Sequence, residues 1–353
     1  MKRYLILENG DVFCGEAIGA EAESFGELVF TTGMCGYLET LTDPSYFGQI
    51  VLQTFPLIGN YGVIEEDFEG DCFVKGYVVN ELCNAPSNFR CGDTLDDYLK
   101  EKEIVGISGV DTREITKIIR ESGVMNAAIS NSPDFSAELL KGYTVKNAVS
   151  SVSHGKTEVF ECNEKAKYRV ALYDLGAKRN IVRCLLKRGC EVICVPYNTT
   201  AEEVLALNVD GIMLSNGPGD PAENTEVIEE IKKLLGKKPM FGICLGHQLM
   251  ALSLGAETEK LKYGHRGVNQ PVKEVNGKRT YITSQNHGYA VVSGSVKDGE
   301  VSFINANDGT CEGIDYKHLD AFSVQFHPEA CSGPHDTEFL FDKFINLLDK
   351  GEM

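Results

Sequence analysis

The sequence predicts an α/β domain in its C-terminal part, preceded by a β-rich α+β domain. Strands and helices alternate from residue 168 onward, a rhythm typical of a largely parallel sheet flanked by helices. Strands with irregular connections dominate the residues before about 145, and a polar stretch separates the two patterns. The 353 residues suffice for two domains. We therefore predict an N-terminal domain at 1–150, a linker at 151–167 and a C-terminal domain at 168–353.

The N-terminal domain is predicted from short apolar runs and from one helix signal. Strands are expected within 4–19, where two of them flank an Asn-Gly-Asp turn, and at 26–30 and 76–82. Asp111 followed by Glu114 predicts the start of a helix, since an acidic cap and a glutamate three residues later satisfy free backbone N–H groups.

The C-terminal domain is predicted from the repeated alternation of strand and helix. The expected strands lie at 168–174, 191–197, 210–216 and 239–244. The expected helices lie at 180–189, 201–208, 225–236, 247–255 and 337–350, with short strands between Leu261 and the last helix. Ligands of such sheets bind beyond the carboxyl ends of the parallel strands, so the functional site is expected there.

Composition restricts the classes of partner. The chain has 34 basic and 52 acidic residues, a net charge of -18, which argues against nucleic acid or an anionic membrane as the main partner. The first apolar run is too short for a signal peptide, and no segment approaches the ~20 apolar residues of a membrane span. We expect a cytoplasmic protein. The twelve cysteines include no C-x-x-C pair, and we expect no metal site.

Cys244 is the first candidate catalytic residue. It lies between an apolar strand and a helix, with Gly242 and Gly246 two residues to either side. This spacing is typical of a nucleophile elbow, in which flanking glycines permit a tight turn. The helix N-terminus favours a thiolate, and the N–H of Leu245 is available to an oxyanion. Taken alone, the glycines are equally compatible with a buried structural cysteine.

A His-Pro-Glu sequence follows the alternating strand at 321–326 and supplies the partners that the cysteine needs. His327 and Glu329 point to the same side of an extended segment, and Pro328 restricts their geometry. Glu329 can then orient the imidazole and stabilise its charged form. Together with the elbow, this pair predicts a Cys–His–Glu amidase site.

Three further segments are candidates for binding substrate. Gly217 or Gly219 is expected to give the second oxyanion N–H, because Pro218 between them has none. Gln248 lies one helical turn after the cysteine and is expected to contact substrate, although a solvated position is the alternative. The segment 285–289 ends another expected strand, and on its own pattern it is an ordinary turn.

These motifs carry a resemblance to known families. The sequences G-I-C-L-G-H-Q at 242–248, N-G-P-G-D-P at 216–221 and H-P-E at 327–329 resemble class I glutamine amidotransferases. Four more motifs resemble the small subunit of carbamoyl phosphate synthetase: F-T-T-G-M-C-G-Y at 30–37, T-D-P-S-Y at 42–46, G-V-D-T-R at 109–113 and Y-D-L-G-A-K-R-N-I at 173–181. This resemblance covers essentially the whole chain.

The resemblance implies that the chain hydrolyses glutamine through a thioester on Cys244. Ammonia would pass through a channel to a large subunit, which uses ATP and bicarbonate to make carbamoyl phosphate for arginine and pyrimidine synthesis. No cofactor is expected in this chain, since ATP and Mg²⁺ belong to the large subunit. The glutamine contacts implied by the family are Ser45, Gly217, Gly219, Leu245, Gln248, Asn286, Gly288 and Tyr289. Tyr289 departs from the phenylalanine expected there, with little consequence for a contact made through the backbone.

Three other functions remain as alternatives. A glutaminase serving anthranilate or GMP synthesis would not carry the N-terminal domain. A non-catalytic regulatory subunit on the same fold should have lost its nucleophile, whereas Cys244, His327 and Glu329 are all present. A stand-alone cysteine peptidase would act on peptides without a partner.

Overall fold

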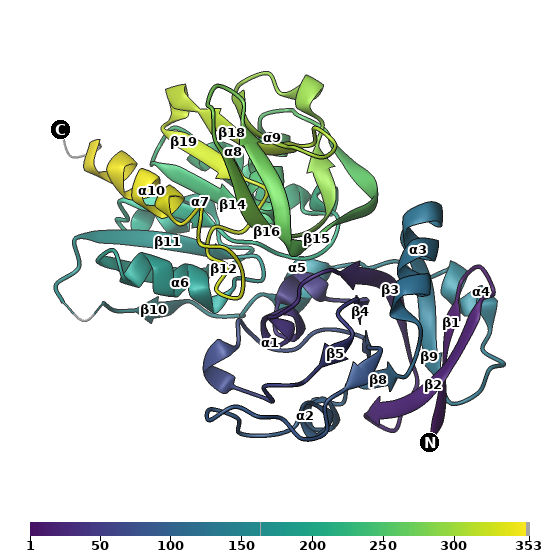
Figure 1. The fold of residues 1–353 in the computed structure, drawn as a ribbon. Coiled ribbons are helices and arrows are strands. Elements are labelled where there is room, and N and C mark those ends of the chain that lie inside the picture. Colours follow the sequence, from purple (N-terminus) through teal and green to yellow (C-terminus); the bar gives the residue numbers. More distant parts are fainter. Residues whose placement is uncertain (163, 351–353) are drawn as a thin grey trace. The chain divides into compact units, whose positions relative to one another are not determined.

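The computed structural model describes residues 1–162 and 164–350, and the chain divides into two compact units, Met1–Lys146 and Asn147–Met353 (Figure 1). The boundary differs by a few residues from the predicted one. The expected linker contains ordered elements of the second unit: α5 (Ala148–Val152) extends into it, and β10 (Glu158–Phe160) pairs with an edge strand of the large sheet. A three-residue strand in a polar stretch has no periodicity to reveal it, because only its pairing makes it a strand.

In the first unit, a sheet closes on itself in the order β1-β2-β8-β6-β4-β3-β9. Its strands are β1 (Lys2–Leu7), β2 (Val12–Gly19), β3 (Ser24–Thr31), β4 (Gln49–Gln53), β6 (Gly76–Val78), β8 (Val105–Ser108) and β9 (Met125–Ser130). A separate pair consists of β5 (Leu57–Ile58) and β7 (Glu81–Leu82). The helices are α1 (Tyr37–Leu41), α2 (Leu95–Glu101), α3 (Thr112–Ser122) and α4 (Ala137–Lys141).

The predicted helix start in this unit is confirmed. Asp111 is the N-cap of α3, and its carboxylate accepts a hydrogen bond of 2.9 Å from the N–H of Glu114. The buried side of α3 contains Ile115 and Ile119, as the apolar spacing indicates.

The second unit is built on one long mixed sheet, in the order β10-β12-β11-β13-β14-β19-β18-β17-β15-β16. Its parallel part consists of β11 (Tyr168–Asp174), β12 (Cys190–Pro196), β13 (Gly211–Leu214), β14 (Met240–Ile243) and β19 (Ala321–Val324). Its antiparallel part consists of β15 (Thr258–Glu274), β16 (Thr280–Val291), β17 (Glu300–Asn305) and β18 (Cys311–Tyr316). This mixed sheet confirms the predicted α/β fold.

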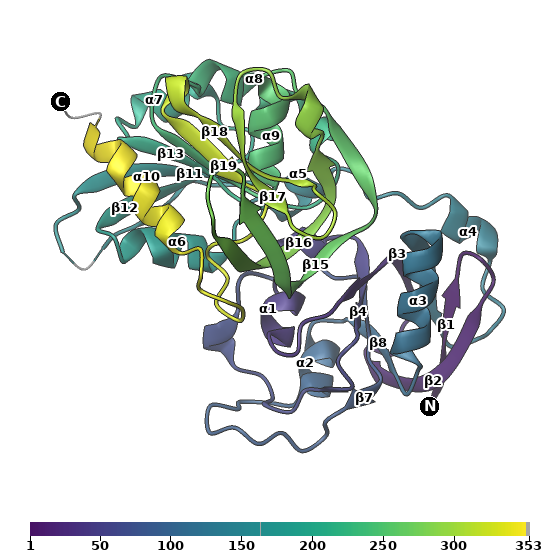
Figure 2. The ribbon, with the colours of Figure 1, turned by 45° about the horizontal axis from the view of Figure 1, so that its top comes forward.

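Helices cover both faces of the parallel part (Figure 2). Alternate residues of β11 face opposite ways: Val170 and Leu172 pack with α6 (Arg179–Leu186) and α10 (Phe339–Lys350), whereas Ala171 and Tyr173 pack on the other side. That other face is covered by α7 (Ala201–Ala206), α8 (Thr225–Leu234) and α9 (Leu245–Ser253). Among the described residues, none of the helices combines the length and the apolar character needed to cross a membrane.

The antiparallel part differs from the short strands that we expected after Leu261. β15 and β16 form a long hairpin of 17 and 12 residues, with register shifts between Lys260 and His265 and between Gly267 and Gln270. Bulges and polar residues interrupt the alternation of apolar side chains. The sequence pattern therefore predicts several short strands where the hydrogen bonds form one long strand.

Candidate active site

Cys244 occupies a sharp turn between β14 and α9, as the glycine spacing predicts. Its backbone angles, φ 51° and ψ -102°, are strained for a residue with a side chain. A Cβ on Gly246 would lie 2.6 Å from the carbonyl oxygen of Leu214, and one on Gly242 would lie 2.8 Å from the backbone of Gly246. The two glycines are therefore required for the strand and the helix to approach so closely.

The sulfur of Cys244 is buried at the N-terminus of a nine-residue helix, with its residue 2% exposed. The Sγ atom lies 3.7 Å from the carbonyl oxygen of Asn286, to which a thiol donates, and the side-chain amide of Gln325 donates to Sγ over 3.6 Å. The N–H of Leu245 belongs to the first helical turn, where donors have no carbonyl within the helix.

His327 and Glu329 form a buried pair beyond the end of β19. Their atoms Nδ1 and Oε1 are 2.6 Å apart, and both side chains are fully buried. Since a carboxylate accepts, Nδ1 carries the proton and Nε2 presents a lone pair. The thiol of Cys244 is close enough to raise the pKa of this imidazole, and Nε2 is therefore available to the proton of the thiol.

Electrostatics at this position favour the imidazolium that forms when His327 accepts a proton. Burial and the nearby Lys178 lower the pKa of His327, but Glu329 and Cys244 raise it by more, and the net change is upward. Burial raises the pKa of Glu329, whereas His327 and Lys178 lower it, and the carboxylate stays ionised. Glu329 is the partner of His327 that matters most for the chemistry, because it stabilises the imidazolium that forms when the thiol loses its proton.

Lys178 is a member of the site that the sequence reasoning missed. It is 8% exposed, and its Nζ lies 3.4 Å from Nδ1 of His327 and 3.7 Å from Oε1 of Glu329. Asn180, in the first turn of α6, donates its amide to the backbone carbonyl of Glu329, so the start of this helix also holds the backbone of Glu329. The available signal was a lysine at the carboxyl end of β11, directly before α6, where ligand-binding residues gather.

Gly217 and Gly219 follow β13 beside the elbow, as predicted. A Cβ on Gly217 would lie 2.2 Å from the carbonyl oxygen of Leu175 and 2.7 Å from the side chain of Leu245. Gly219 has φ +87°, in the left-handed region that favours glycine. Asn216 holds this segment, because its amide accepts from the N–H of Lys178 at 3.1 Å and donates to Gly176 at 2.9 Å.

The structure places the segment 285–289 against the sulfur, through the carbonyl of Asn286, and places Gln248 against Tyr289 and Gln325. Gln248 is 3% exposed, and its Nε2 donates to the carbonyl of Tyr289 at 2.7 Å and to the side-chain oxygen of Gln325 at 2.9 Å. Asn286, Gly288 and Tyr289 lie within β16 rather than in a turn at its end, which corrects the expectation from the pattern alone. The bulges in β15 lie opposite this part of β16 and interrupt the regular pairing of the two strands.

Ser45 is the one predicted glutamine contact in the first unit. It lies in a short 3-10 helix, Pro44–Tyr46, where its N–H donates to the carboxylate of Asp43 at 2.9 Å. The residue is 8% exposed. Its contact with glutamine stays a prediction.

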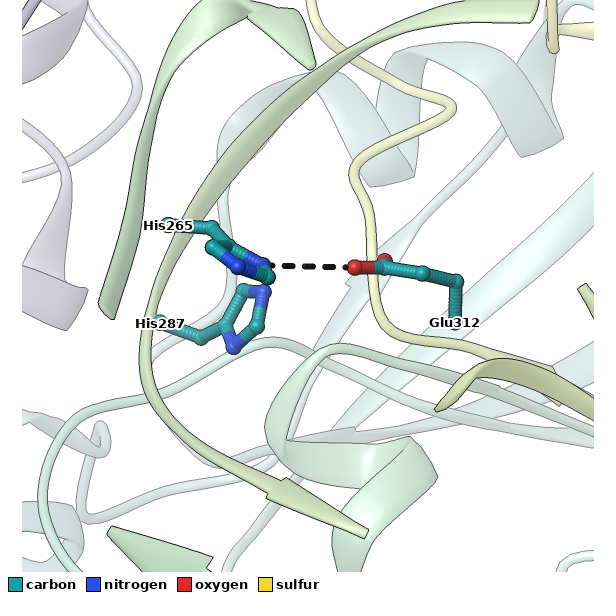
Figure 3. A group of neighbouring side chains, drawn as sticks. All are labelled: His265, His287 and Glu312. Carbon is teal, nitrogen blue, oxygen red and sulfur yellow. Dashed lines mark ion pairs between the residues drawn. The ribbon is translucent and has the colours of Figure 1, made fainter. Parts of the chain in front are cut away.

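A second buried cluster consists of His265, His287 and Glu312 (Figure 3). These residue types can bind a divalent cation, and their ligand atoms lie within 4.8 Å of one another. In this structure the atoms are engaged in hydrogen bonds. Glu312 receives the amide of Gln285 at 3.0 Å and lies 3.3 Å from Nδ1 of His265, while His287 donates from Nδ1 to the carbonyl of Tyr289 at 2.8 Å. We interpret the cluster as a support for β16.

Comparison with known families agrees with this geometry. The family model described as glutamine amidotransferase class-I matches residues 171–347, and that of the carbamoyl-phosphate synthase small chain, CPSase domain, matches residues 5–129. The second unit is thus a class I glutamine amidotransferase domain.

Relatives over the full length are more specific. The chain is 54% identical to the carbamoyl phosphate synthase pyrimidine-specific small chain of Bacillus subtilis (strain 168), covering 100% of this chain and 97% of that protein. It is 52% identical to the carbamoyl phosphate synthase small chain of Clostridium perfringens (strain 13 / Type A), covering 98% and 99% respectively. The protein from Listeria monocytogenes serotype 4b (strain F2365) is 50% identical, with coverage of 99% and 98%. The chain belongs to the carbamoyl phosphate synthase small chain family.

Proposed function

We propose that this chain hydrolyses L-glutamine and supplies the ammonia to a carbamoyl phosphate synthase large subunit. The observation that carries the proposal is the strained elbow at Cys244, beside a buried histidine whose Nδ1 is 2.6 Å from Glu329. A nucleophile, a base and a group that orients the base are the requirements of acyl transfer.

The reaction follows from the position of the protons. The thiol of Cys244 gives its proton to Nε2 of His327, and the thiolate attacks the side-chain carbonyl carbon of glutamine. The N–H of Leu245 and one from Gly217 or Gly219 stabilise the oxyanion that forms. The C–N bond then breaks, and His327 returns the proton to the departing ammonia.

Hydrolysis of the thioester completes the cycle. His327 takes a proton from water, the resulting hydroxide attacks the γ-glutamyl carbonyl, and the C–S bond breaks to give glutamate and the free thiol. Ammonia must be kept from bulk water, where it would be protonated to unreactive ammonium at neutral pH. This requirement favours a closed route to a partner subunit.

The partner and pathway are part of the same proposal. Membership of a small-chain family supports a large subunit that binds ATP, Mg²⁺ and bicarbonate, with no cofactor in this chain. The pyrimidine-specific name of one relative supports pyrimidine synthesis, and arginine synthesis is the other use of carbamoyl phosphate that we expect. We propose that the glutamine pocket uses Gln248, Asn286, Gly288 and Tyr289, with Ser45 from the first unit.

The decisive experiment is Cys244→Ser in the complex with the large subunit. Glutamine-dependent synthesis should fall by at least about 10³-fold, because the weakly nucleophilic hydroxyl replaces the thiol. Synthesis from added ammonia should continue at the rate of the unaltered complex. Glutamine-dependent synthesis that survives in this variant would refute the proposal. Hydrolysis of peptides by the isolated chain would favour a peptidase instead.

A further inference from the structure

Gln325 has no role in the mechanism above, although its side chain touches the reacting atom. It follows directly after β19 and is fully buried. β14 and β19 are parallel, with Ile243 opposite Val324, and the N–H of Cys244 donates to the carbonyl of Val324 at 2.9 Å. This register places Gln325 beside the cysteine. Ser323 and Gln325 both face α9, since they contact His247 and Gln248 of that helix.

The direction of the Gln325 amide is determined by a chain of hydrogen bonds that begins at the backbone. The carbonyl of Tyr289 can only accept, so the group of Gln248 that lies 2.7 Å from it must be the NH₂ group. The same NH₂ group lies 2.9 Å from the Gln325 side chain, which must present its oxygen there. The NH₂ group of Gln325 is then the one that lies 3.6 Å from Sγ of Cys244. The reverse orientation would oppose two donors and turn an oxygen toward the sulfur.

The two contacts of the sulfur respond in opposite ways when the thiol loses its proton. A thiol can donate to the carbonyl of Asn286, but a thiolate has no proton to donate and is repelled by that oxygen. The N–H of Gln325 gains strength instead, since hydrogen bonds to an ion are roughly twice as strong as neutral ones. The site is buried, and a hydrogen bond to an ion is stronger there than in water.

We propose that Gln325 is a catalytic residue that stabilises the thiolate of Cys244 and, through Gln248, links that stabilisation to the glutamine pocket. This inference rests on the proposed function and adds to it a second source of thiolate stabilisation, distinct from the helix N-terminus. It also gives Gln248 a second task. Its NH₂ group is committed to Tyr289 and Gln325, so its side-chain oxygen is the part of the amide left to receive a donor group of the substrate.

The test measures alkylation of Cys244 by iodoacetamide over a range of pH, in the full chain, with each cysteine followed by mass spectrometry. In Gln325→Leu the rate at Cys244 near neutral pH should fall about tenfold, the loss expected for one hydrogen bond to a charged group. The pH at which the rate reaches half its maximum should rise. The exposed Cys14, Cys35 and Cys331 serve as internal references, and their rates should not change.

Two further variants separate this role from a packing role. Gln325→Glu keeps the shape but places a carboxylate against the sulfur, and it should slow alkylation more than Gln325→Leu does. Ser323→Ala is the matched control: Ser323 is equally buried on the same face, and its hydroxyl contacts His247 at 2.8 Å rather than the sulfur. Burial lowers the pKa of His247 to about 3, so that pair is neutral. The control should retain the pH profile of the unaltered chain.

The outcomes are distinct from those for the proposed function. Alkylation reports on the sulfur without glutamine, whereas failure of the proposed function would appear as an unaltered chain that cannot hydrolyse glutamine. For glutamine hydrolysis, Gln325→Leu should lower kcat more than it raises KM, and Gln325→Asn should not restore the rate because its amide is one methylene too short. Unchanged pH profiles in both Gln325→Leu and Gln325→Glu, in chains with normal thermal unfolding, would overturn the inference.

Discussion

The parallel and antiparallel parts of the second unit's sheet contribute to one site by different means. In the parallel part, backbone geometry places the reactive groups: Cys244 lies on a strained turn, and His327 and Glu329 follow the end of β19. In the antiparallel part, buried polar side chains hold the segment 285–289: Gln285 donates to Glu312, and Glu312 lies 3.3 Å from Nδ1 of His265 (Figure 3).

The reactive groups and the support of the segment 285–289 are therefore encoded by different kinds of signal. A tight turn needs particular residues at fixed positions, and its loss removes the chemistry. In a hydrogen-bonded network, several side chains together hold a binding segment. Loss of one of them displaces the segment only slightly, because the others remain. Changes in the parallel part should therefore reduce kcat, whereas changes in the antiparallel part should chiefly affect KM and stability.

Of two substitutions that remove a buried charge, one in each part of the sheet, Glu329→Gln is expected to have the larger effect. Glutamine keeps an oxygen near Nδ1 of His327 but loses the charge, so the catalytic rate should fall roughly tenfold. Glu329 raises the pKa of His327, and its removal lowers that pKa. The imidazolium that protonates the leaving ammonia would then be lost at lower pH. The alkaline limb of kcat/KM for glutamine should move toward neutral pH, and a limb that stays in place would contradict the assigned role of Glu329.

A smaller effect is expected for Glu312→Gln. Burial lowers the pKa of His265, but Glu312 and Asp308 raise it by more, so its folded-state pKa exceeds the unfolded value of 6.5. The resulting stabilisation is complete below pH 6.5 and is lost as pH rises through the folded-state pKa.

In the Glu312→Gln variant the free energy of unfolding should therefore depend less on pH above 6.5, as urea titrations at several pH values would show. KM for glutamine should rise about fivefold, from one weakened hydrogen bond, with kcat nearly unchanged. A large loss of kcat with an unchanged KM in this variant would contradict the proposed difference between the parallel and antiparallel parts of the sheet.

The sequence predicts the parallel part well because its signals are local. The glycines around Cys244, the spacing of His327 and Glu329, and the alternation of strand and helix each reflect a short-range requirement of the backbone. The roles of Lys178 and Gln325 depend instead on which strand ends become neighbours, and no spacing within either segment reveals that Lys178 faces Glu329.

In the antiparallel part, too, the sequence pattern does not show which strands become neighbours. The residues of its network come from β15, β16, β17 and β18, and their polarity resembles that of solvated strands until the pairing places them together. The sequence does not predict β10 for a similar reason, because this segment is a strand only through its pairing with β12. The role of the segment 285–289 in binding glutamine is implied by the family resemblance and not by the segment's own pattern.

The most direct test of the account is to trap the intermediate. The complex is mixed with glutamine, quenched in acid within the first turnovers, digested and analysed by mass spectrometry. We predict a γ-glutamyl group, the mass of glutamine less ammonia, on the peptide that contains Cys244, and its absence from Cys244→Ser. Active hydrolysis without that adduct under conditions that preserve thioesters, or an adduct on another residue, would contradict the claim that Cys244 is the nucleophile.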